Sequence, residues 1–183
     1  MLFRSFPKDT VALIKTAQDA GAPLRIVETV AAVNDTRKRG MARKVAAALG
    51  GGLRGKTIAV LGLTFKPNTD DMREAPSIPL ITALTDMGAR VRAYDPVGMA
   101  QAKEVIAGIE LAAGPYDCAE GADALVIVTE WEQFRALDFE RLRTVMKQPV
   151  LVDLRNVYRP EEIEGFTYHG IGRPSDPKDN PKA

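Results

Sequence analysis

A cluster of charged residues follows one of the apolar runs of this chain and has the composition of an anion-binding loop. The run covers residues 58–61, and the polar segment after it contains Lys66, Asp70, Asp71 and Arg73. A lysine ammonium and a planar arginine guanidinium both suit phosphate or sugar oxygens, and carboxylates orient such cations or accept hydrogen bonds from hydroxyl groups. The competing interpretation is a surface loop closed by ion pairs, and this segment alone does not separate the two.

A further cation follows a second apolar run. Arg155 comes after residues 150–152, within the sequence Asp153-Leu-Arg-Asn156. If both runs are strands of one parallel sheet, their carboxyl ends share the edge at which ligands of open α/β sheets bind. Two cations that meet there are costly to hold together without an anion between them, so Lys66 and Arg155 predict a diphosphate site.

The other candidate residues favour structural roles. Asp95 precedes a proline, which favours a turn over a ribose ligand, and Trp131 is expected to pack rather than stack on a base. Cys118 is expected to be a small packed side chain and His169 a structural residue. The turn after the first predicted strand lacks the second and third glycines of a dinucleotide fingerprint, so this sheet is not expected to bind NAD in the usual way.

Strand-like and helix-like segments alternate after residue 52, which predicts an α/β fold with a Rossmann-like, doubly wound parallel sheet preceded by a long helix. The expected strands are residues 57–61, 90–94, 124–128 and 150–152, with a weaker one at 167–169. The helices expected between them are residues 77–87, 99–106, 116–120 and 139–146.

Two helices are predicted before the sheet, at residues 9–21 and about 24–49. The second would be about 39 Å long at 1.5 Å per residue, which is longer than the domain and typical of a helix that bridges to another domain or subunit. Its polar centre, residues 34–39, is interpreted as a solvated face rather than a ligand site. The predicted organisation is a helical region at 1–53, the Rossmann-like domain at 54–173 and a disordered tail at 174–183.

Composition excludes several classes of function. The chain has 183 residues, of which 45% are hydrophobic, and a formal net charge of +1, so nothing indicates binding to nucleic acid or to an anionic membrane. No apolar stretch is long enough for a membrane span or a secretory signal, so a cytoplasmic location is expected. One cysteine and one histidine leave no ligands for a His/Cys zinc site, and no metal site is indicated.

Six motifs, in order, resemble the carboxyl-terminal part of the UDP-glucose/GDP-mannose dehydrogenase family. They are Phe6-Pro-Lys-Asp9, the segment 61–74, Tyr94-Asp-Pro96, Thr129-Glu-Trp131, Asp153-Leu-Arg-Asn156 and His169-Gly-Ile-Gly-Arg173. The resemblance covers about residues 5–173. It implies two Rossmann-type domains joined by a central helical region, and oxidation of the C6 alcohol of a nucleotide sugar to a carboxylate. That reaction takes two NAD-dependent steps and passes through a thiohemiacetal on a cysteine.

The resemblance also assigns roles to residues. It implies that Phe65, Lys66 and Arg155 hold the UDP-sugar, that Arg73 reaches toward NAD bound mainly by another domain, and that Asp9 assists the catalytic cysteine. The substrate it implies is UDP-glucose and the product UDP-glucuronate. The helix near residues 24–49 resembles the element through which family members form homodimers.

The chain departs from the family at the nucleophile. Ser5 stands at the position of the family's cysteine, and a hydroxyl without an adjacent base is a much weaker nucleophile than a thiolate. The NAD domain expected of a whole enzyme is absent, so the chain alone is expected to be inactive. Two alternatives stay open: a fragment of a GDP-mannose or UDP-N-acetyl sugar dehydrogenase, and a non-catalytic dimerisation or nucleotide-sensing module.

Overall fold

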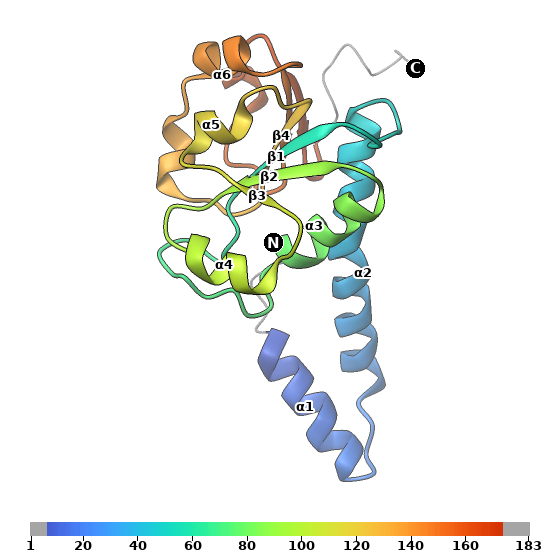
Figure 1. Ribbon diagram of the computed structural model, residues 1–183. Helices are drawn as coiled ribbons and strands as arrows, with labels where there is room; N and C mark the ends of the chain where they lie inside the picture. Colours follow the sequence, from blue (N-terminus) through green and yellow to red (C-terminus); the bar gives the residue numbers. More distant parts are fainter. Residues whose placement is uncertain (1–6, 174–183) are drawn as a thin grey trace, which may run out of the picture.

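A six-stranded parallel sheet forms the centre of the computed structural model, which describes residues 7–173 (Figure 1). The strand order is β3-β2-β1-β4-β5-β6, and every pairing is parallel. The strands are β1 (Thr57–Leu61), β2 (Arg90–Tyr94), β3 (Glu110–Leu111), β4 (Ala124–Ile127), β5 (Val150–Asp153) and β6 (Thr167–Gly170). The predicted doubly wound fold is therefore confirmed. Only β3 was not predicted, because two residues are too few to show a hydrophobic period.

Side chains of the central strands alternate between two apolar cores, one on each face of the sheet. Ile58 and Val60 of β1 contribute to the core beneath α2, α3 and α4. Ala59 and Leu61 contribute to the opposite core, which α5 and α6 cover. Burial on both faces explains why the strands read as continuous apolar runs in the sequence.

The helices of the domain match the predicted segments closely. They are α3 (Ser77–Asp86), α4 (Met99–Val105), α5 (Pro115–Ala119) and α6 (Phe139–Val145), with 3-10 turns η1 (Glu132–Ala136) and η2 (Pro160–Glu162). No helix within residues 7–173 has the length and apolar content needed to cross a membrane. The predicted tail at 174–183 and Ser5 lie outside the described residues.

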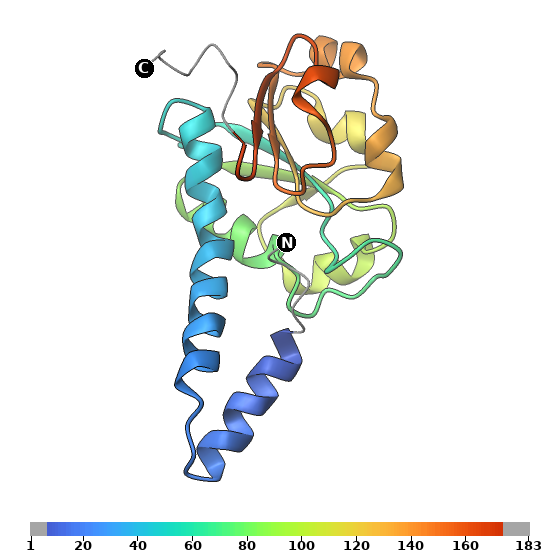
Figure 2. The ribbon, with the colours of Figure 1, turned by 180° about the vertical axis from the view of Figure 1, so that it is seen from behind.

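Helices α1 (Pro7–Asp19) and α2 (Arg25–Ala48) form a hairpin that projects from the domain, and the second confirms the predicted long helix (Figures 1 and 2). The last turns of α2 pack on the sheet core through buried residues such as Val45. Its first half is different, because Ile26 is 82% exposed and Val30 and Val33 are also exposed. The hairpin therefore presents apolar side chains that no described part of the chain covers.

A buried carboxylate, Asp95, organises the edge of the sheet where the strands end. Its Oδ2 accepts hydrogen bonds from the backbone N–H groups of Leu63 (2.7 Å) and Thr64 (3.1 Å) and from the Trp131 indole (3.1 Å). Its Oδ1 accepts one from the Gly98 N–H at 2.8 Å. The interpretation of Asp95 as a turn residue is confirmed, because its Oδ1 accepts the hydrogen bond from an N–H group three residues further along the chain.

Close packing at the same edge explains two glycines. Gly62 has a φ of +91°, and a Cβ there would lie 2.6 Å from the Thr129 backbone nitrogen. A Cβ on Gly98 would lie 2.3 Å from Thr64 Cγ2. The segments that follow β1, β2 and β4 are therefore in direct contact, and side chains larger than hydrogen at these positions would push them apart.

We expect the substitution Asp95→Asn to lower the free energy of unfolding by about 3 kcal/mol, because an amide NH₂ would face N–H donors in a buried site. Urea denaturation followed by circular dichroism measures this. The matched control Asp86→Asn changes an exposed carboxylate at the end of α3 and should shift stability by less than about 0.5 kcal/mol. Equal stability of the Asp95 variant and the unsubstituted chain would contradict the assigned role.

Candidate functional site: the carboxyl edge of the sheet

The strand order places Lys66 and Arg155 on segments that leave the same edge of the sheet. Strand β1 lies next to β4, and the chain continues from β1 to β2 on one side and from β4 to β5 on the other. This is the point of an open α/β sheet where the connections diverge and a ligand crevice forms. Only β4 separates β1 from β5, a spacing of about 10 Å at 4.8 Å per strand interval. The predicted shared edge is confirmed, whereas the ligand roles of the two cations stay predictions.

Arg155 is paired with a carboxylate that the sequence analysis did not single out. Its Nε lies 2.6 Å from Glu130 Oε2, and its Nη2 donates to Glu130 Oε1 at 2.7 Å. The side chains are 16% and 25% exposed, respectively. Glu130 already provides a negative charge next to Arg155, so the arginine does not need an anionic ligand to balance its charge. The role of Arg155 as a ligand-binding residue is therefore supported by its position at the carboxyl edge of the sheet and not by its charge.

Lys66 stands at the exposed part of the loop between β1 and α3. The Phe65 N–H donates to the Asp71 carbonyl at 2.9 Å, which closes the loop, and the Phe65 side chain packs against the core. Asn68 has a φ of 62°, a left-handed conformation that asparagine tolerates better than most residues. Lys66 forms no ion pair with any carboxylate in residues 7–173, unlike Arg155.

The two aspartates of this loop have protein partners. Asp71 accepts hydrogen bonds from Arg73 Nε and Nη2, both at 2.8 Å, and this contact raises the pKa of the Arg73 guanidinium. Asp70 accepts one from the Gln101 side chain at 2.7 Å. The ion pair between Asp71 and Arg73 agrees with the interpretation of a surface loop that contains an ion pair, whereas anion binding by this loop stays a prediction. Arg73 stays 81% exposed beside a shallow groove between the loop and α4.

A lysine from the long helix also reaches this loop. Lys38 Nζ lies 3.4 Å from Glu74 Oε2, and its side chain is only 12% exposed. Met41 and Pro76 lie beside it. The interpretation of residues 34–39 as a purely solvated face is therefore wrong for Lys38. The helical period could not reveal this, because the partner is 36 residues away in the chain.

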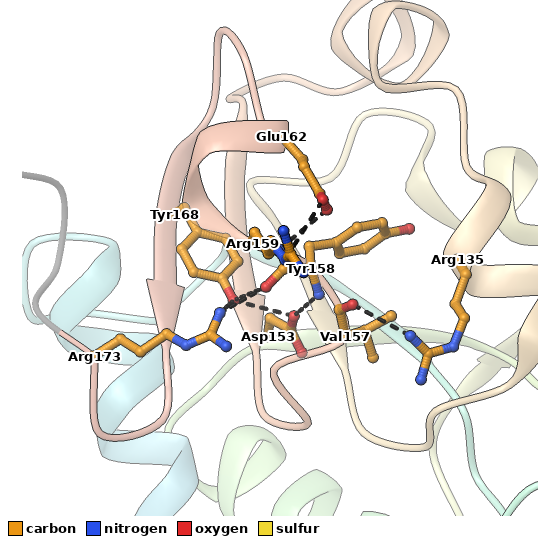
Figure 3. Close-up of polar contacts among 8 residues, drawn as sticks. All are labelled: Arg135, Asp153, Val157, Tyr158, Arg159, Glu162, Tyr168 and Arg173. Carbon is orange, nitrogen blue, oxygen red and sulfur yellow. Dashed lines mark hydrogen bonds and ion pairs between the residues drawn. The ribbon is translucent and has the colours of Figure 1, made fainter.

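A hydrogen-bond network around Asp153 and Tyr158 fixes the turn after β5 (Figure 3). Arg155 lies on this turn. Asp153 accepts hydrogen bonds from the N–H groups of Arg155 (3.0 Å) and Tyr158 (3.1 Å) and from the Tyr168 hydroxyl (3.2 Å). Arg173 Nη1 donates to the Tyr158 carbonyl at 2.6 Å. Burial, with the nearby charge of Asp153, raises the pKa of Tyr168 to about 12, so its hydroxyl remains a donor at neutral pH.

Asn156 joins this turn to the end of β6. Its amide Nδ2 donates to the Ile171 carbonyl, and its Oδ1 accepts from the Ile171 N–H, each at 2.9 Å. Asn156 has a φ of 52°, which few residues other than glycine, asparagine and aspartate adopt readily. His169 lies in β6, paired with Val152, in the strand that the sequence predicted.

The single cysteine does not have the properties of a nucleophile. Cys118 is fully buried on α5, with its Sγ 3.3 Å from the Arg92 carbonyl oxygen. Burial raises its pKa to about 12, so the thiol is protonated at neutral pH. The expectation of a packed side chain is confirmed, as it is for Trp131, which is 6% exposed.

Asp9, the residue expected to assist a catalytic cysteine, is exposed in the first turn of α1. Within residues 7–173 no group of three or more histidine, cysteine or acidic residues is arranged to hold a metal ion.

Comparison with known proteins links the sheet to one protein family. Residues 59–160 match the model of the "UDP-glucose/GDP-mannose dehydrogenase family, UDP binding domain". The chain is 63% identical over 171 residues to the UDP-glucose 6-dehydrogenase of Rhizobium meliloti, and 46% identical over 177 residues to that of Pseudomonas aeruginosa. These matches cover 92% of this chain but 39% of each relative, so the chain spans about two fifths of their length.

A solved structure with the same fold agrees with these matches. The UDP-glucose dehydrogenase of the hyperthermophilic archaeon Pyrobaculum islandicum superimposes with a TM-score of 0.76 and 34% sequence identity. The superposition covers 90% of this chain and 36% of that one.

The buried thiol of Cys118 is expected to resist modification in the folded chain. Because its pKa is raised to about 12, almost no thiolate is present at pH 8, and the side chain is also inaccessible. Reaction with Ellman's reagent should be slow until urea unfolds the chain, and should then release one equivalent of thiolate. The control Thr85→Cys adds an exposed thiol at the end of α3 that should react at once in the folded state. Rapid labelling of Cys118 without denaturant would contradict its assignment as an inert side chain.

Proposed function

Because the chain belongs to the UDP-glucose/GDP-mannose dehydrogenase family, we propose that it is the UDP-sugar-binding part of an NAD-dependent UDP-glucose 6-dehydrogenase. The reaction converts UDP-glucose, two NAD⁺ and water into UDP-glucuronate and two NADH. Fragments of GDP-mannose or UDP-N-acetyl sugar dehydrogenases are the alternatives. The two relatives with 63% and 46% identity, both UDP-glucose 6-dehydrogenases, support the first choice.

One observation carries this proposal: Lys66 and Arg155 leave the carboxyl edge of the sheet on either side of β4. In the proposed complex, Lys66 supplies a point charge and Arg155 a planar pair of donors to the diphosphate. Phe65 lies next to Lys66, where it would contact the UDP-sugar. The bonds of Asp153 and Asn156 to neighbouring backbone and side-chain groups support this role, because they hold the turn of Arg155 in one conformation.

NAD is the proposed oxidant, held mainly by protein outside this sheet. Two observations support this proposal: the segment after β1 has a single glycine, and protein donors already bond to both carboxylate oxygens of Asp95. Arg73 is exposed on the loop at the carboxyl edge, and it would contact NAD from that position. The side chains at the carboxyl edge would hold and orient the substrate, and bound NAD would supply the hydride acceptor.

The thiohemiacetal step needs a thiolate, but Cys118, the one cysteine of this chain, is buried and protonated. The thiolate would therefore have to come from a cysteine that is not part of this chain. Asp9, in the first turn of α1, is proposed to assist that cysteine in the whole enzyme. Ser5 occupies the corresponding position in this chain and lies outside the described residues.

The affinity for UDP-glucose tests the proposed site. We expect Lys66→Ala and Arg155→Ala each to weaken binding by about 1.5–3 kcal/mol, the range for hydrogen bonds to charged groups, which is roughly a 10- to 150-fold rise in Kd. Titration calorimetry measures these values. Arg90→Ala removes an exposed arginine at the opposite edge of the sheet and should leave Kd unchanged.

Three outcomes would count against this proposal. Unchanged affinity in both alanine variants would remove Lys66 and Arg155 from it. Competition experiments identify the nucleotide that the site recognises: we expect UDP to displace bound UDP-glucose and GDP not to displace it. Displacement by GDP would favour a GDP-mannose dehydrogenase, and no binding of either nucleotide would favour a non-catalytic module.

Turnover by the purified chain is expected to be undetectable. The physical reason is that its single cysteine is buried and that the turn after β1 is not a glycine-rich pyrophosphate turn. Absorbance at the NADH band measures this, with UDP-glucose and NAD⁺ supplied. Steady NADH formation would refute this part of the proposal.

The exposed apolar side chains of α2 support a homodimer through this helix. Ile26, Val30 and Val33 lie at helical spacing along its first half and are exposed. We expect a dimer in sedimentation velocity, and a shift toward monomer for the double variant Val30→Glu with Val33→Glu. The control Ala32→Glu places a charge on a different side of α2 and should leave the mass unchanged. A monomeric unsubstituted chain would contradict the dimer.

A further inference from the structure

The ion pair between Glu130 and Arg155 is formed by two neighbouring strand ends. Ile127 of β4 is in register with Asp153 of β5, so Glu130 and Arg155 follow the last paired residues at similar distances. The contact is side-on: the guanidinium uses Nε and Nη2, at 2.6 Å and 2.7 Å, against the two carboxylate oxygens. This geometry turns the opposite edge of the guanidinium, which carries Nη1, away from Glu130.

The backbone around Glu130 is held firmly in place. On one side, the Thr129 hydroxyl donates to the Thr64 carbonyl at 2.8 Å. On the other side, the Trp131 indole donates to Asp95 at 3.1 Å. All four residues of these two hydrogen bonds are buried, and Trp131, the most exposed of them, is 6% exposed. The backbone of Glu130 is therefore fixed on both sides. Arg155, in contrast, has a long side chain that can adopt many rotamers.

We propose that Glu130 is a positioning residue for Arg155, which pre-sets the guanidinium for the diphosphate of a nucleotide sugar. This inference rests on the proposed function and deepens it. An arginine that is already held in one orientation loses less conformational entropy when a ligand binds. Asp153 performs the corresponding task for the backbone of Arg155, because it accepts the hydrogen bond from its N–H at 3.0 Å.

The charge of Glu130 acts in the opposite direction to its positioning effect. A carboxylate next to the crevice repels a diphosphate, so its removal would by charge alone strengthen the binding of UDP-glucose. Loss of positioning would weaken that binding. The sign of the change in affinity therefore separates a positioning residue from a mere neighbouring charge.

The experiment compares Kd for UDP-glucose in the full chain and in Glu130→Gln. We expect the amide, which cannot form the charged side-on pair, to raise Kd at least fivefold although the substitution makes the crevice more positive. Glu130→Asp keeps the charge but withdraws the carboxylate by one methylene, and should also raise Kd. The control Glu132→Gln, two residues away on η1 and 92% exposed, should not change Kd.

A second background shows whether Glu130 acts through Arg155. In Arg155→Ala, adding Glu130→Gln should cause no further weakening, because the group that Glu130 positions is gone. Thermal unfolding of each variant establishes that it is folded, and Glu130→Asp carries the test if Glu130→Gln does not fold.

The outcomes separate this inference from the proposed function. Unchanged or tighter binding by folded Glu130→Gln, with weakened binding by Arg155→Ala, would overturn the positioning role alone. Weakening by Glu130→Gln that persists in the Arg155→Ala background would also overturn it. Unchanged affinity in both Arg155→Ala and Lys66→Ala would instead remove the proposed binding site itself.

Discussion

The buried carboxylate of Asp95 is the interaction on which the edge of the sheet depends. When β1 ends, the N–H groups of Leu63 and Thr64 leave the ladder and need new acceptors, since unpaired buried donors are costly. Asp95, at the end of the neighbouring strand β2, accepts from both and also from Trp131 after β4. A single buried side chain thus joins the segments that follow three adjacent strands. The loop that carries Lys66 begins from this fixed point.

Charge pairing around that point follows a consistent pattern. Arg155 is paired with Glu130, Arg73 with Asp71, and Lys38 with Glu74, each between 2.6 and 3.4 Å. The pair between Arg73 and Asp71, whose arginine is 81% exposed, contributes little to stability in water. All three pairs restrict the conformations of long side chains. Lys66 differs, since it forms no ion pair with a carboxylate in the part of the chain from 7 to 173. At the carboxyl edge of the sheet, ion pairs therefore orient the guanidinium groups of Arg155 and Arg73, whereas no such ion pair among the described residues orients the ammonium group of Lys66.

The sheet has the strand order of a dinucleotide-binding fold but a different first turn. A glycine-rich turn would bring the backbone and a helix N-terminus close to a pyrophosphate. Here Gly62 is followed by a longer polar loop, closed by the bond from Phe65 to Asp71, before α3 begins. Recognition of an anion would therefore fall to side chains at the strand ends, in keeping with the proposed UDP-sugar site. The apolar face of α2 lies outside this sheet and serves the proposed dimer instead.

Local patterns in the sequence determined the elements of this protein. Strand-like segments identified β1, β2, β4 and β5, of which β1, β4 and β5 contain continuous apolar runs. Helical spacing identified α2, and Asp95 before a proline indicated a turn, because these signals depend on residues close together in the chain. They also placed Lys66 and Arg155 after strands. The tertiary structure alone decided which distant side chains meet: Glu130 with Arg155, Lys38 with Glu74, and Trp131 with Asp95. The physical reason is that hydrophobic period is a local property of the chain, whereas these contacts depend on strand order and register, which bring together residues 25 to 36 positions apart.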